Sequence, residues 1–323
     1  EIGLKAGLTE EQKKLFSYFV PVRGMSEQIV EVLDNDRRAQ REGTSKTGNL
    51  LVIGRKGSGK TVLAVDIVKA IQKQRNLKQG KVAIVTGAAV GLGQGMAVGL
   101  AEAGADIVAV GISSMDEVKA AVEAVGRRCL TIEANLMSTD PIQSIIDQAI
   151  AEFGHIDILV NNAGIIRRED SVKFSEKDWD DVINLNLKSV FFFCQAAANQ
   201  FMKQGTGGKI INIASMLSFQ GGIRVPSYTA SKSGVKGITM LMANEWAKHG
   251  ININAIAPGY MATANTAQLR ADESRSSEIL GRIPADRWGT PEDLKGPVVF
   301  LASSASDYVN GYTIAVDGGW LAR

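Results

Sequence analysis

From residue 81 onward, short apolar runs of strand length alternate with longer stretches of helix length. The apolar runs, rich in Val and Ile, are 82–85, 107–110, 156–160, 210–213 and 251–256. The stretches between them include 94–103, 114–125, 141–153 and 231–248. Strands that are apolar throughout are typical of a parallel sheet buried between two layers of helices. The alternation therefore predicts an α/β fold of the Rossmann type, with a doubly wound parallel sheet.

The first 78 residues follow a different pattern. A polar, mostly helical stretch, 9–40, leads through a cluster of helix-breaking residues to one apolar strand, 50–53, and a second helix, 61–74. This part holds 15 Lys and Arg against 9 Asp and Glu, whereas the remaining 245 residues hold 21 against 25. Neither balance reaches that of a nucleic-acid-binding surface. We therefore expect a basic N-terminal segment, 1–78, followed by an α/β domain, 79–323, and no nucleic-acid partner.

A glycine-rich loop in the first part matches the pattern of a phosphate-binding loop. The sequence Gly54-Arg-Lys-Gly-Ser-Gly-Lys60-Thr61 fits G-x-x-x-x-G-K-[ST], follows the strand 50–53 and opens the helix 61–74. The candidate phosphate-binding residues are Gly54, Gly59, Lys60 and Thr61. This part resembles the start of an AAA-type P-loop ATPase domain, but no later apolar strand ends in the Asp-Glu pair of that family. Our hypothesis is a phosphate loop without its catalytic half, joined to the second domain near 80–87.

A second glycine-rich loop, Thr86-Gly87-Ala-Ala-Val-Gly91-Leu92-Gly93, comes directly after the apolar run 82–85. Its glycines permit a tight turn, close approach of a pyrophosphate and close helix packing. Further along lie Asn161-Asn162-Ala163-Gly164, Asn186, Ser215, Tyr228-Thr-Ala-Ser-Lys232 and Pro258-Gly259. With these motifs in this order and spacing, residues 79–323 resemble the short-chain dehydrogenase/reductase family over essentially its whole length.

The spacing of Tyr228 and Lys232 has a physical logic. Residues i and i+4 of a helix share one face, so the ammonium lies near the phenol and favours its ionised form. The resemblance implies that Tyr228 exchanges a proton with the substrate oxygen, that Ser215 hydrogen-bonds this oxygen, and that Asn186 holds a water linking Lys232 to solvent. Hydride then passes between substrate and nicotinamide without a metal. The implied cofactor-binding residues are Gly87, Gly91, Leu92, Gly93, Asn135, Asn162, Ala163, Gly164, Tyr228, Lys232, Pro258, Gly259 and Thr263.

The residues that follow the second apolar run, 107–110, distinguish NAD from NADP in this type of fold. An acidic residue there would bind the ribose 2′-hydroxyl, and an Arg would meet a 2′-phosphate. The sequence is Gly111-Ile-Ser-Ser114, with neither charge. Because no cation is present, NAD is favoured over NADP.

Three stretches, 164–170, 213–227 and 307–323, are similar to those family members that act on deoxy sugar acids in uronate and pectin breakdown. The resemblance implies oxidation or reduction of 2-dehydro-3-deoxy-D-gluconate or 2-deoxy-D-gluconate. An arginine offers a planar fork to a carboxylate, so the candidate substrate residues are Arg167, Arg168, Gln220 and Arg224, with 260–285 as a lid. The alternatives are another carbonyl substrate, such as a 3-oxoacyl thioester or a sugar alcohol, and ATP binding through 54–61.

Cysteine usage and apolar segments bear on the cell compartment and on assembly. Cys129 and Cys194 are the only cysteines, without a CxxC or a histidine cluster, so we expect reduced thiols, no metal site and a cytoplasmic protein. The uncharged window 82–101 contains five glycines and is interpreted as strand, loop and helix rather than a membrane span. Around 191–198 we expect a helix that packs against another subunit of a homo-oligomer, a dimer of dimers.

Overall fold

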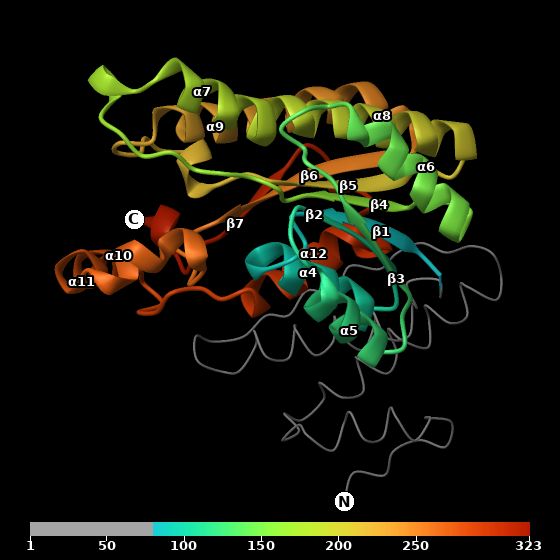
Figure 1. The fold of residues 1–323 in the computed structure, drawn as a ribbon, viewed down its shortest axis with the longest axis horizontal. Helices are drawn as coiled ribbons and strands as arrows, with labels where there is room; N and C mark the ends of the chain where they lie inside the picture. The colour runs from blue at the N-terminus through green and yellow to red at the C-terminus, as the bar shows by residue number, and fades with distance from the viewer. Residues whose placement is uncertain (1–79) are drawn as a thin grey trace, which may run out of the picture. The chain divides into compact units, whose positions relative to one another are not determined.

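The computed structural model describes residues 80–323, which form a three-layer α/β domain around one parallel sheet (Figure 1). The seven strands have the order β3-β2-β1-β4-β5-β6-β7, and every neighbouring pair is parallel. Their bounds are β1 Val82–Thr86, β2 Asp106–Gly111, β3 Cys129–Glu133, β4 Ile158–Asn161, β5 Gly208–Ile213, β6 Ile251–Pro258 and β7 Thr313–Val316. The predicted doubly wound sheet is confirmed, while the elements expected in 1–78 lie outside the described residues.

Two of the seven strands, β3 and β7, are absent from the sequence prediction. Both lie at the edges of the sheet, where one side of a strand has no partner. Their sequences, CLTIE and TIAV, are only partly buried, whereas β1, β2 and β4 are buried throughout. Edge strands need fewer apolar residues than central ones, so the continuous apolar runs identified only the central part of the sheet.

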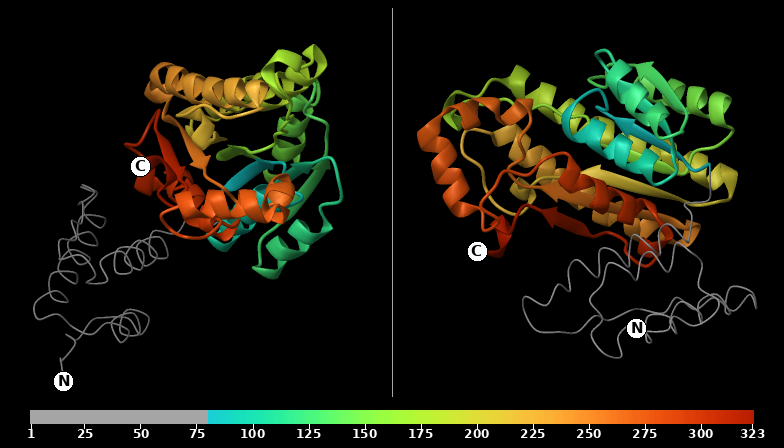
Figure 2. Two further views of the ribbon diagram at one scale, coloured as in Figure 1. Left: turned by 90° about the vertical axis from the view of Figure 1, so that its left-hand side faces the viewer. Right: turned by 90° about the horizontal axis from the view of Figure 1, so that it is seen from below.

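Helices cover both faces of the sheet (Figures 1 and 2). One apolar core lies between the sheet and α6, α8 and α9, and the other lies between the sheet and α4, α5 and α12. The helices are α4 Gly91–Glu102, α5 Asp116–Ala124, α6 Pro141–Phe153, α7 Glu176–Ile183, α8 Ser189–Gln204, α9 Pro226–Trp246, α10 Ala267–Ala271, α11 Glu273–Arg282 and α12 Glu292–Ala302. The window 82–101 is β1, a glycine loop and most of α4, as predicted, and no helix within 80–323 is long and apolar enough to cross a membrane.

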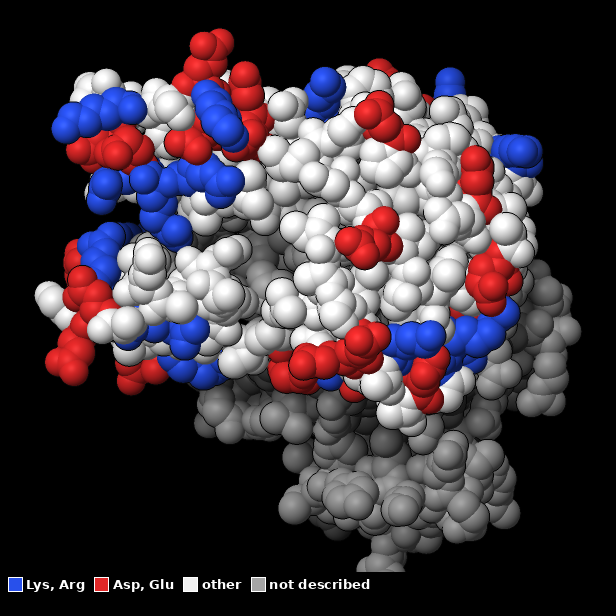
Figure 3. Space-filling view, viewed as in Figure 1, with Lys and Arg blue, Asp and Glu red and all other residues white. Residues whose placement is uncertain are grey.

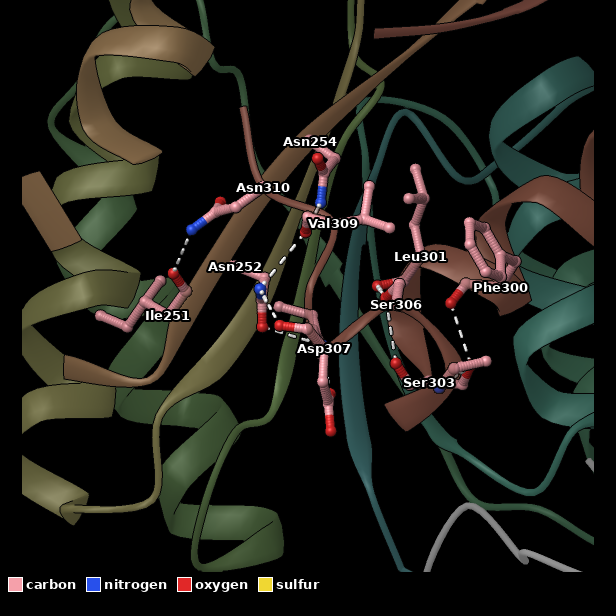
Figure 4. Close-up of polar contacts among 12 residues, drawn as sticks. Ile251, Asn252, Asn254, Phe300, Leu301, Ser303, Ser306, Asp307, Val309 and Asn310 are labelled. Carbon is pink, nitrogen blue, oxygen red and sulfur yellow. Dashed lines mark hydrogen bonds and ion pairs between the residues drawn. The ribbon is translucent and has the colours of Figure 1, made fainter. Parts of the chain in front are cut away.

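Asparagine side chains fix the connection between α12 and β7 (Figure 4). Asn252 and Asn254 of β6 donate to the Val309 carbonyl at 3.3 and 2.8 Å. In return, Asn310 accepts a hydrogen bond from the main-chain amide of Ile253 at 2.7 Å. The loop before β7 makes no strand-to-strand hydrogen bonds, and these side-chain bonds tie it to β6 instead. They therefore determine where β7 begins.

Helices α4 and α12 pack closely because α4 presents glycines to α12. A Cβ added at Gly95 would lie 2.6 Å from Pro291 Cβ, and one at Gly99 would lie 2.7 Å from Lys295 Cγ. Both distances are shorter than any normal carbon–carbon contact. This contact holds the first turn of α4 beside the segment that enters α12.

We expect Gly95→Ala to lower the free energy of unfolding by about 1–3 kcal/mol, because the added methyl group overpacks this contact. The matched control is Gly281→Ala in α11, where a Cβ meets nothing within 4 Å. The control should be neutral or stabilising by up to about 1 kcal/mol, because Ala is the better helix former. Urea unfolding of both variants measures the difference. Equal stability of the two variants would contradict the close packing.

Candidate active site

The predicted motifs meet at the carboxyl ends of four neighbouring strands. The glycine loop follows β1, Asn162 follows β4, Ser215 follows β5, and Gly259 follows β6. Strand β1 has β2 on one side and β4 on the other, so the connections leave in opposite directions at this point. A crevice at such a switch point is the usual ligand site of an open α/β sheet.

The glycine loop after β1 is shaped to receive a phosphate group. Gly87 and Gly91 both have φ of +63°, and a Cβ on Gly93 would lie 2.1 Å from the Gly87 carbonyl oxygen. Helix α4 begins at Gly91, and its N-cap, Val90, makes no side-chain capping bond. The first amides of α4 therefore keep their donors for an anion. The loop and the uncapped helix fit the pyrophosphate of a dinucleotide.

Thr86 and Asn162 tie this loop to the end of β4. The Thr86 hydroxyl accepts hydrogen bonds from the amides of Asn162 and Ala163, both at 3.0 Å. The Asn162 side chain donates to the carbonyls of Thr86 and Gly87 at 3.0 and 3.1 Å. The two segments expected to contact the cofactor are thus fixed relative to each other.

The residues expected around the adenosine and the nicotinamide occupy the margins of this crevice. At the end of β2, a Cβ on Gly111 would lie 3.3 Å from Met115 Sδ, so a larger residue there would require Met115 to shift. Asn135 is exposed after β3, where its side chain accepts a bond from the Met137 amide at 3.0 Å. On the opposite side, the Thr263 methyl group is the nearest atom to a Cβ built on Gly91, at 3.8 Å.

Ser215, Tyr228 and Lys232 come together at the start of α9. Ser215 is the N-cap of the turn η3 (Met216–Ser218), its hydroxyl accepts a hydrogen bond from the Leu217 amide at 3.2 Å, and it acts to lower the pKa of the Tyr228 phenol. Lys232 is buried, its Nζ lies 5.7 Å from the centre of the Tyr228 ring, and it donates to the Ile213 carbonyl at 2.5 Å. The expected common helix face is therefore present.

The pKa values of the pair differ from the expectation. Burial raises the pKa of the Tyr228 phenol above its ordinary value, although the hydrogen bond from Ser215 and the charge of Arg168 act in the opposite direction. Burial also lowers the pKa of Lys232 to about 8. The expected lowering of the Tyr228 pKa by Lys232 is not found, because desolvation outweighs the neighbouring charges and the ammonium is directed to a carbonyl.

Asn186 is buried in η2 (Asn184–Lys188), a π-helical turn between α7 and α8. Its side chain accepts from the Ile165 amide at 2.9 Å and donates to the Ile165 carbonyl at 2.8 Å. It also donates to the Ser231 hydroxyl at 3.4 Å. Wide turns of this kind are frequent at functional sites, and this one joins the segment after β4 to α9.

The three candidate arginines have different surroundings. Arg167 pairs with Asp178 and Asp181 of α7, at 3.3 and 3.9 Å. Arg224 has φ of +64° and pairs with Asp170 at 3.1 Å. Arg168 donates to the Asn265 carbonyl at 3.1 Å. Of the three arginines, it is the one whose charge acts to lower the pKa of Tyr228.

A hollow opens between the end of the α7–α9 layer and the helices α10 and α11, and both basic and acidic side chains lie along its margins (Figure 3). Burial raises the pKa of Tyr260 above its ordinary value and Glu278 acts in the same direction, while the charges of Arg275, Arg282 and Arg168 act to lower it. Three arginine charges thus act on this tyrosine, and such a surplus favours an anionic ligand. Residues 260–285 contain η5 (Ala264–Thr266), α10 and α11, and their expected role as a lid stays a prediction.

Sequence reasoning missed an aromatic cluster under this lid. The Tyr260 ring lies edge-on to Trp288 and Trp320, with centroids 5.5 and 4.9 Å apart. Met216, Ile279 and Ile283 complete the cluster. The candidate substrate residue Gln220 accepts a hydrogen bond from the Trp320 indole at 3.3 Å. The aromatic residues are widely separated in the chain, and only the position of Tyr260 directly after Pro258-Gly259 gave a signal.

The phosphate-loop candidates Gly54, Gly59, Lys60 and Thr61 lie outside the described residues. Their predicted role therefore stays a prediction.

Comparison with known proteins identifies the class of this protein. A family model described as enoyl-(acyl carrier protein) reductase matches residues 87–321. A curated 2-dehydro-3-deoxy-D-gluconate 5-dehydrogenase from Escherichia coli is 74% identical over 245 residues, covering 76% of this chain and 97% of the relative. The chain belongs to the short-chain dehydrogenase/reductase family, and it is an oxidoreductase acting on a CH–OH group.

Two further relatives extend this comparison. The 2-dehydro-3-deoxy-D-gluconate 5-dehydrogenase of Bacillus subtilis is 53% identical, covering 76% of this chain and 96% of that protein. A solved structure described as a 2-deoxy-D-gluconate 3-dehydrogenase from Agrobacterium tumefaciens, with bound NADP, is 54% identical with a TM-score of 0.70. The match covers 76% of this chain and 98% of the Agrobacterium protein's chain.

Burying Lys232 destabilises the fold at neutral pH. Its pKa falls from 10.5 to about 8, so the unfolded chain binds this proton more tightly, and this group's contribution to stability rises as the pH rises from about 8 to 10.5. We expect Lys232→Met to raise the free energy of unfolding at pH 7 by about 1–3 kcal/mol. We also expect it to abolish the pH-dependent rise and to remove activity.

Urea unfolding at pH 7 and at pH 10 measures both effects. The matched control is Lys236→Met, one turn further along α9, where the half-buried Lys236 lies over the Phe219 ring at 3.9 Å. This control should leave the pH dependence of stability unchanged. A Lys232→Met protein less stable than wild type at pH 7 would contradict a cost of burial.

Proposed function

We propose that this protein transfers hydride between a nicotinamide dinucleotide and a deoxy sugar acid, 2-dehydro-3-deoxy-D-gluconate or 2-deoxy-D-gluconate, in uronate and pectin breakdown. The observation that carries the proposal is the meeting of Ser215, Tyr228 and Lys232 at the start of α9, where the Lys232 Nζ lies 5.7 Å from the centre of the Tyr228 ring. The charge of Arg168, which acts on the Tyr228 phenol, supports a carboxylate-bearing substrate at this site. The high identity to curated 2-dehydro-3-deoxy-D-gluconate 5-dehydrogenases supports the same substrate class.

In this proposal, the chain's own residues bind the substrate oxygen and move its proton. In the reductive direction, Ser215 and Tyr228 hydrogen-bond the carbonyl oxygen, and the Tyr228 hydroxyl gives it a proton. Because burial raises the pKa of Tyr228, the phenol holds this proton at neutral pH. The Ser215 hydroxyl and the charge of Arg168, which both act to lower the pKa of Tyr228, stabilise the phenolate that remains. Asn186 holds the segment after β4 in place and supports a water that resupplies the proton.

A bound nicotinamide dinucleotide supplies or accepts the hydride. We propose that Gly87, Gly91, Leu92 and Gly93 hold its pyrophosphate, and that Asn135 lies against its adenine. Asn162, Ala163, Gly164, Pro258, Gly259 and Thr263 line the nicotinamide side, and Lys232 binds its ribose.

We favour NAD as the cofactor, because the segment after β2, residues 111–114, carries neither a cation for a 2′-phosphate nor an acidic residue. NADP is the second candidate, since the Agrobacterium relative binds it. In that case, the hydroxyls of Ser113 and Ser114 are the donors available at this position.

Two further proposals concern assembly and the N-terminal segment. Phe192 of α8 and Met240 and Leu241 of α9 are exposed by 39, 51 and 49%, and they support the proposal that these helices pack against another copy in a dimer of dimers. We place the protein in the cytoplasm. The match of 54–61 to a phosphate loop is the sequence observation that favours nucleotide binding as a second activity of the chain.

The central test follows absorbance of the reduced nicotinamide with 2-dehydro-3-deoxy-D-gluconate, using wild type and Tyr228→Phe. We expect turnover by wild type with a higher kcat/KM for NADH than for NADPH. Tyr228→Phe should lower kcat at least about 100-fold, because the proton donor is lost. Its affinity for NADH should be retained, since the ring remains. Reduction of a 3-oxoacyl thioester but of no sugar acid would overturn the substrate assignment.

The role of Arg168 in substrate binding is tested by comparing variants of Arg168 and of its neighbour Arg167. We expect Arg168→Leu to raise the KM for the sugar acid about 10- to 100-fold, because a charge-assisted hydrogen bond to the substrate carboxylate contributes about 1.5–3 kcal/mol. The matched variant Arg167→Leu should change this KM less than about threefold, since Arg167 is paired with α7 and a surface ion pair contributes little. Steady-state kinetics with saturating cofactor measures both. Equal effects would place the carboxylate elsewhere.

A further inference from the structure

The last residues of the chain fold back against the lid (Figures 1 and 2). The Asp317 carboxylate accepts hydrogen bonds from the amides of Gly319 and Leu321, both at 2.9 Å, and so shapes the final turn, η7 (Trp320–Ala322). Gly319, with φ of +91°, makes this turn possible. The Arg323 side chain donates to the Gly281 carbonyl of α11 at 3.3 Å. The main-chain amide of Ala285 also donates to the Gly318 carbonyl at 3.0 Å, so both a side chain and the main chain hold the C-terminal turn to the lid.

Trp320 is the centre of this contact. Its side chain is 5% exposed, and its ring packs edge-on against Tyr260. The Arg282 guanidinium of α11 lies 4.1 Å from the centre of the same ring. A cation over an aromatic face is attracted by the ring's electron distribution. Trp320 thus links α11 and the segment after β6 to the C-terminus.

The Trp320 indole also reaches the segment that begins at Ser215. Its N–H donates to the Gln220 side-chain oxygen at 3.3 Å. The main-chain N–H of Gln220 donates to the Met216 carbonyl at 3.3 Å, so Gln220 closes the turn that starts at Ser215. Lid, C-terminus and the Ser215 turn are therefore joined through one residue.

This hydrogen bond determines how the Gln220 amide is oriented. An indole N–H can only donate, so the atom facing it must be the carbonyl oxygen of Gln220 and not its NH2 group. The NH2 group, with two donors, then points away from Trp320. Such a group suits a hydroxyl or carboxylate oxygen of a sugar acid, because both accept hydrogen bonds.

We propose that Trp320 is a positioning residue for the substrate. It fixes the Gln220 amide so that the NH2 group donates to an oxygen of the sugar acid bound between the Ser215 turn and the lid. Gln220 is the substrate-contacting partner, and Trp320 acts through it. This inference rests on the proposed function, because it requires that a polyhydroxy acid is the substrate of Tyr228.

The test is Trp320→Phe, which keeps an aromatic ring in the cluster and under Arg282 but removes the indole N–H. With 2-dehydro-3-deoxy-D-gluconate and NADH, we expect the KM for the sugar acid to rise about five- to tenfold, as expected for one hydrogen bond. The values of kcat and of the KM for NADH should stay within about twofold of wild type, since the reacting groups and the cofactor site are not touched. A purely structural role for Trp320 would not separate these constants.

Trp288→Phe is the matched control, because Trp288 packs edge-on against the same Tyr260 ring at 5.5 Å but its indole does not contact Gln220. Both variants lose part of one ring in one cluster. We therefore expect similar falls in thermal unfolding temperature, with a raised KM for the sugar acid only in Trp320→Phe. Equal KM values in the two variants would overturn the proposal.

A third variant, Gln220→Met, tests whether Trp320 acts through Gln220, and it leaves the aromatic residues of the cluster unchanged. It should raise the KM for the sugar acid at least as much as Trp320→Phe, and the double variant should match Gln220→Met alone, because the two residues act in series. Additive effects would show that Trp320 acts independently of Gln220 and would overturn the inference. If wild type does not turn over the sugar acid at all, the proposed function fails, and the inference falls with it.

Discussion

The close contact between the loops after β1 and β4 is the constraint on which the site depends. The Asn162 side chain bonds the carbonyls of Thr86 and Gly87, and the Thr86 hydroxyl bonds the amides that follow β4. This is possible only where a glycine leaves room, since a Cβ on Gly87 would lie 2.9 Å from the Asn162 nitrogen. Two strands that are neighbours in the sheet thereby present one continuous surface to a dinucleotide.

The order of the chemistry-bearing motifs was readable from the sequence because it follows the strands. The glycine loop, Asn162, Ser215 and Gly259 each follow a buried apolar run, and the four-residue spacing of Tyr228 and Lys232 sets a common helix face. The central strands and this helix face were predictable for this reason, whereas the pairing of Ser215 with Tyr228 was implied by the family resemblance. The edge strands β3 and β7 were not, because their burial is only partial and their sequences carry a weaker apolar signal.

The substrate side was less predictable, because it is made by contacts between distant segments. Arg167 and Arg168 are adjacent in sequence, but Arg167 pairs with Asp178 and Asp181 on α7, whereas Arg168 donates to the Asn265 carbonyl. The pKa of Tyr228 likewise depends on burial, a property of the whole fold, which outweighs the local effect that spacing suggests. The cluster around Trp320 joins three regions of the chain that share no motif.

The asparagines of β6 have a consequence for the tolerance of the C-terminal region to insertions and deletions. They fix the start of β7, and β7 is only four residues long before the turn at Asp317. Side chains alternate between the two faces of a strand, so a shift of one residue in this register exchanges the faces of Thr313–Val316 and moves the following turn by about 3.3 Å. A point substitution on the surface of β7 leaves this geometry intact. An insertion or deletion of one residue between Asn310 and Asp317 would change this geometry. Proteins with this arrangement should therefore vary in sequence in this segment but keep its length.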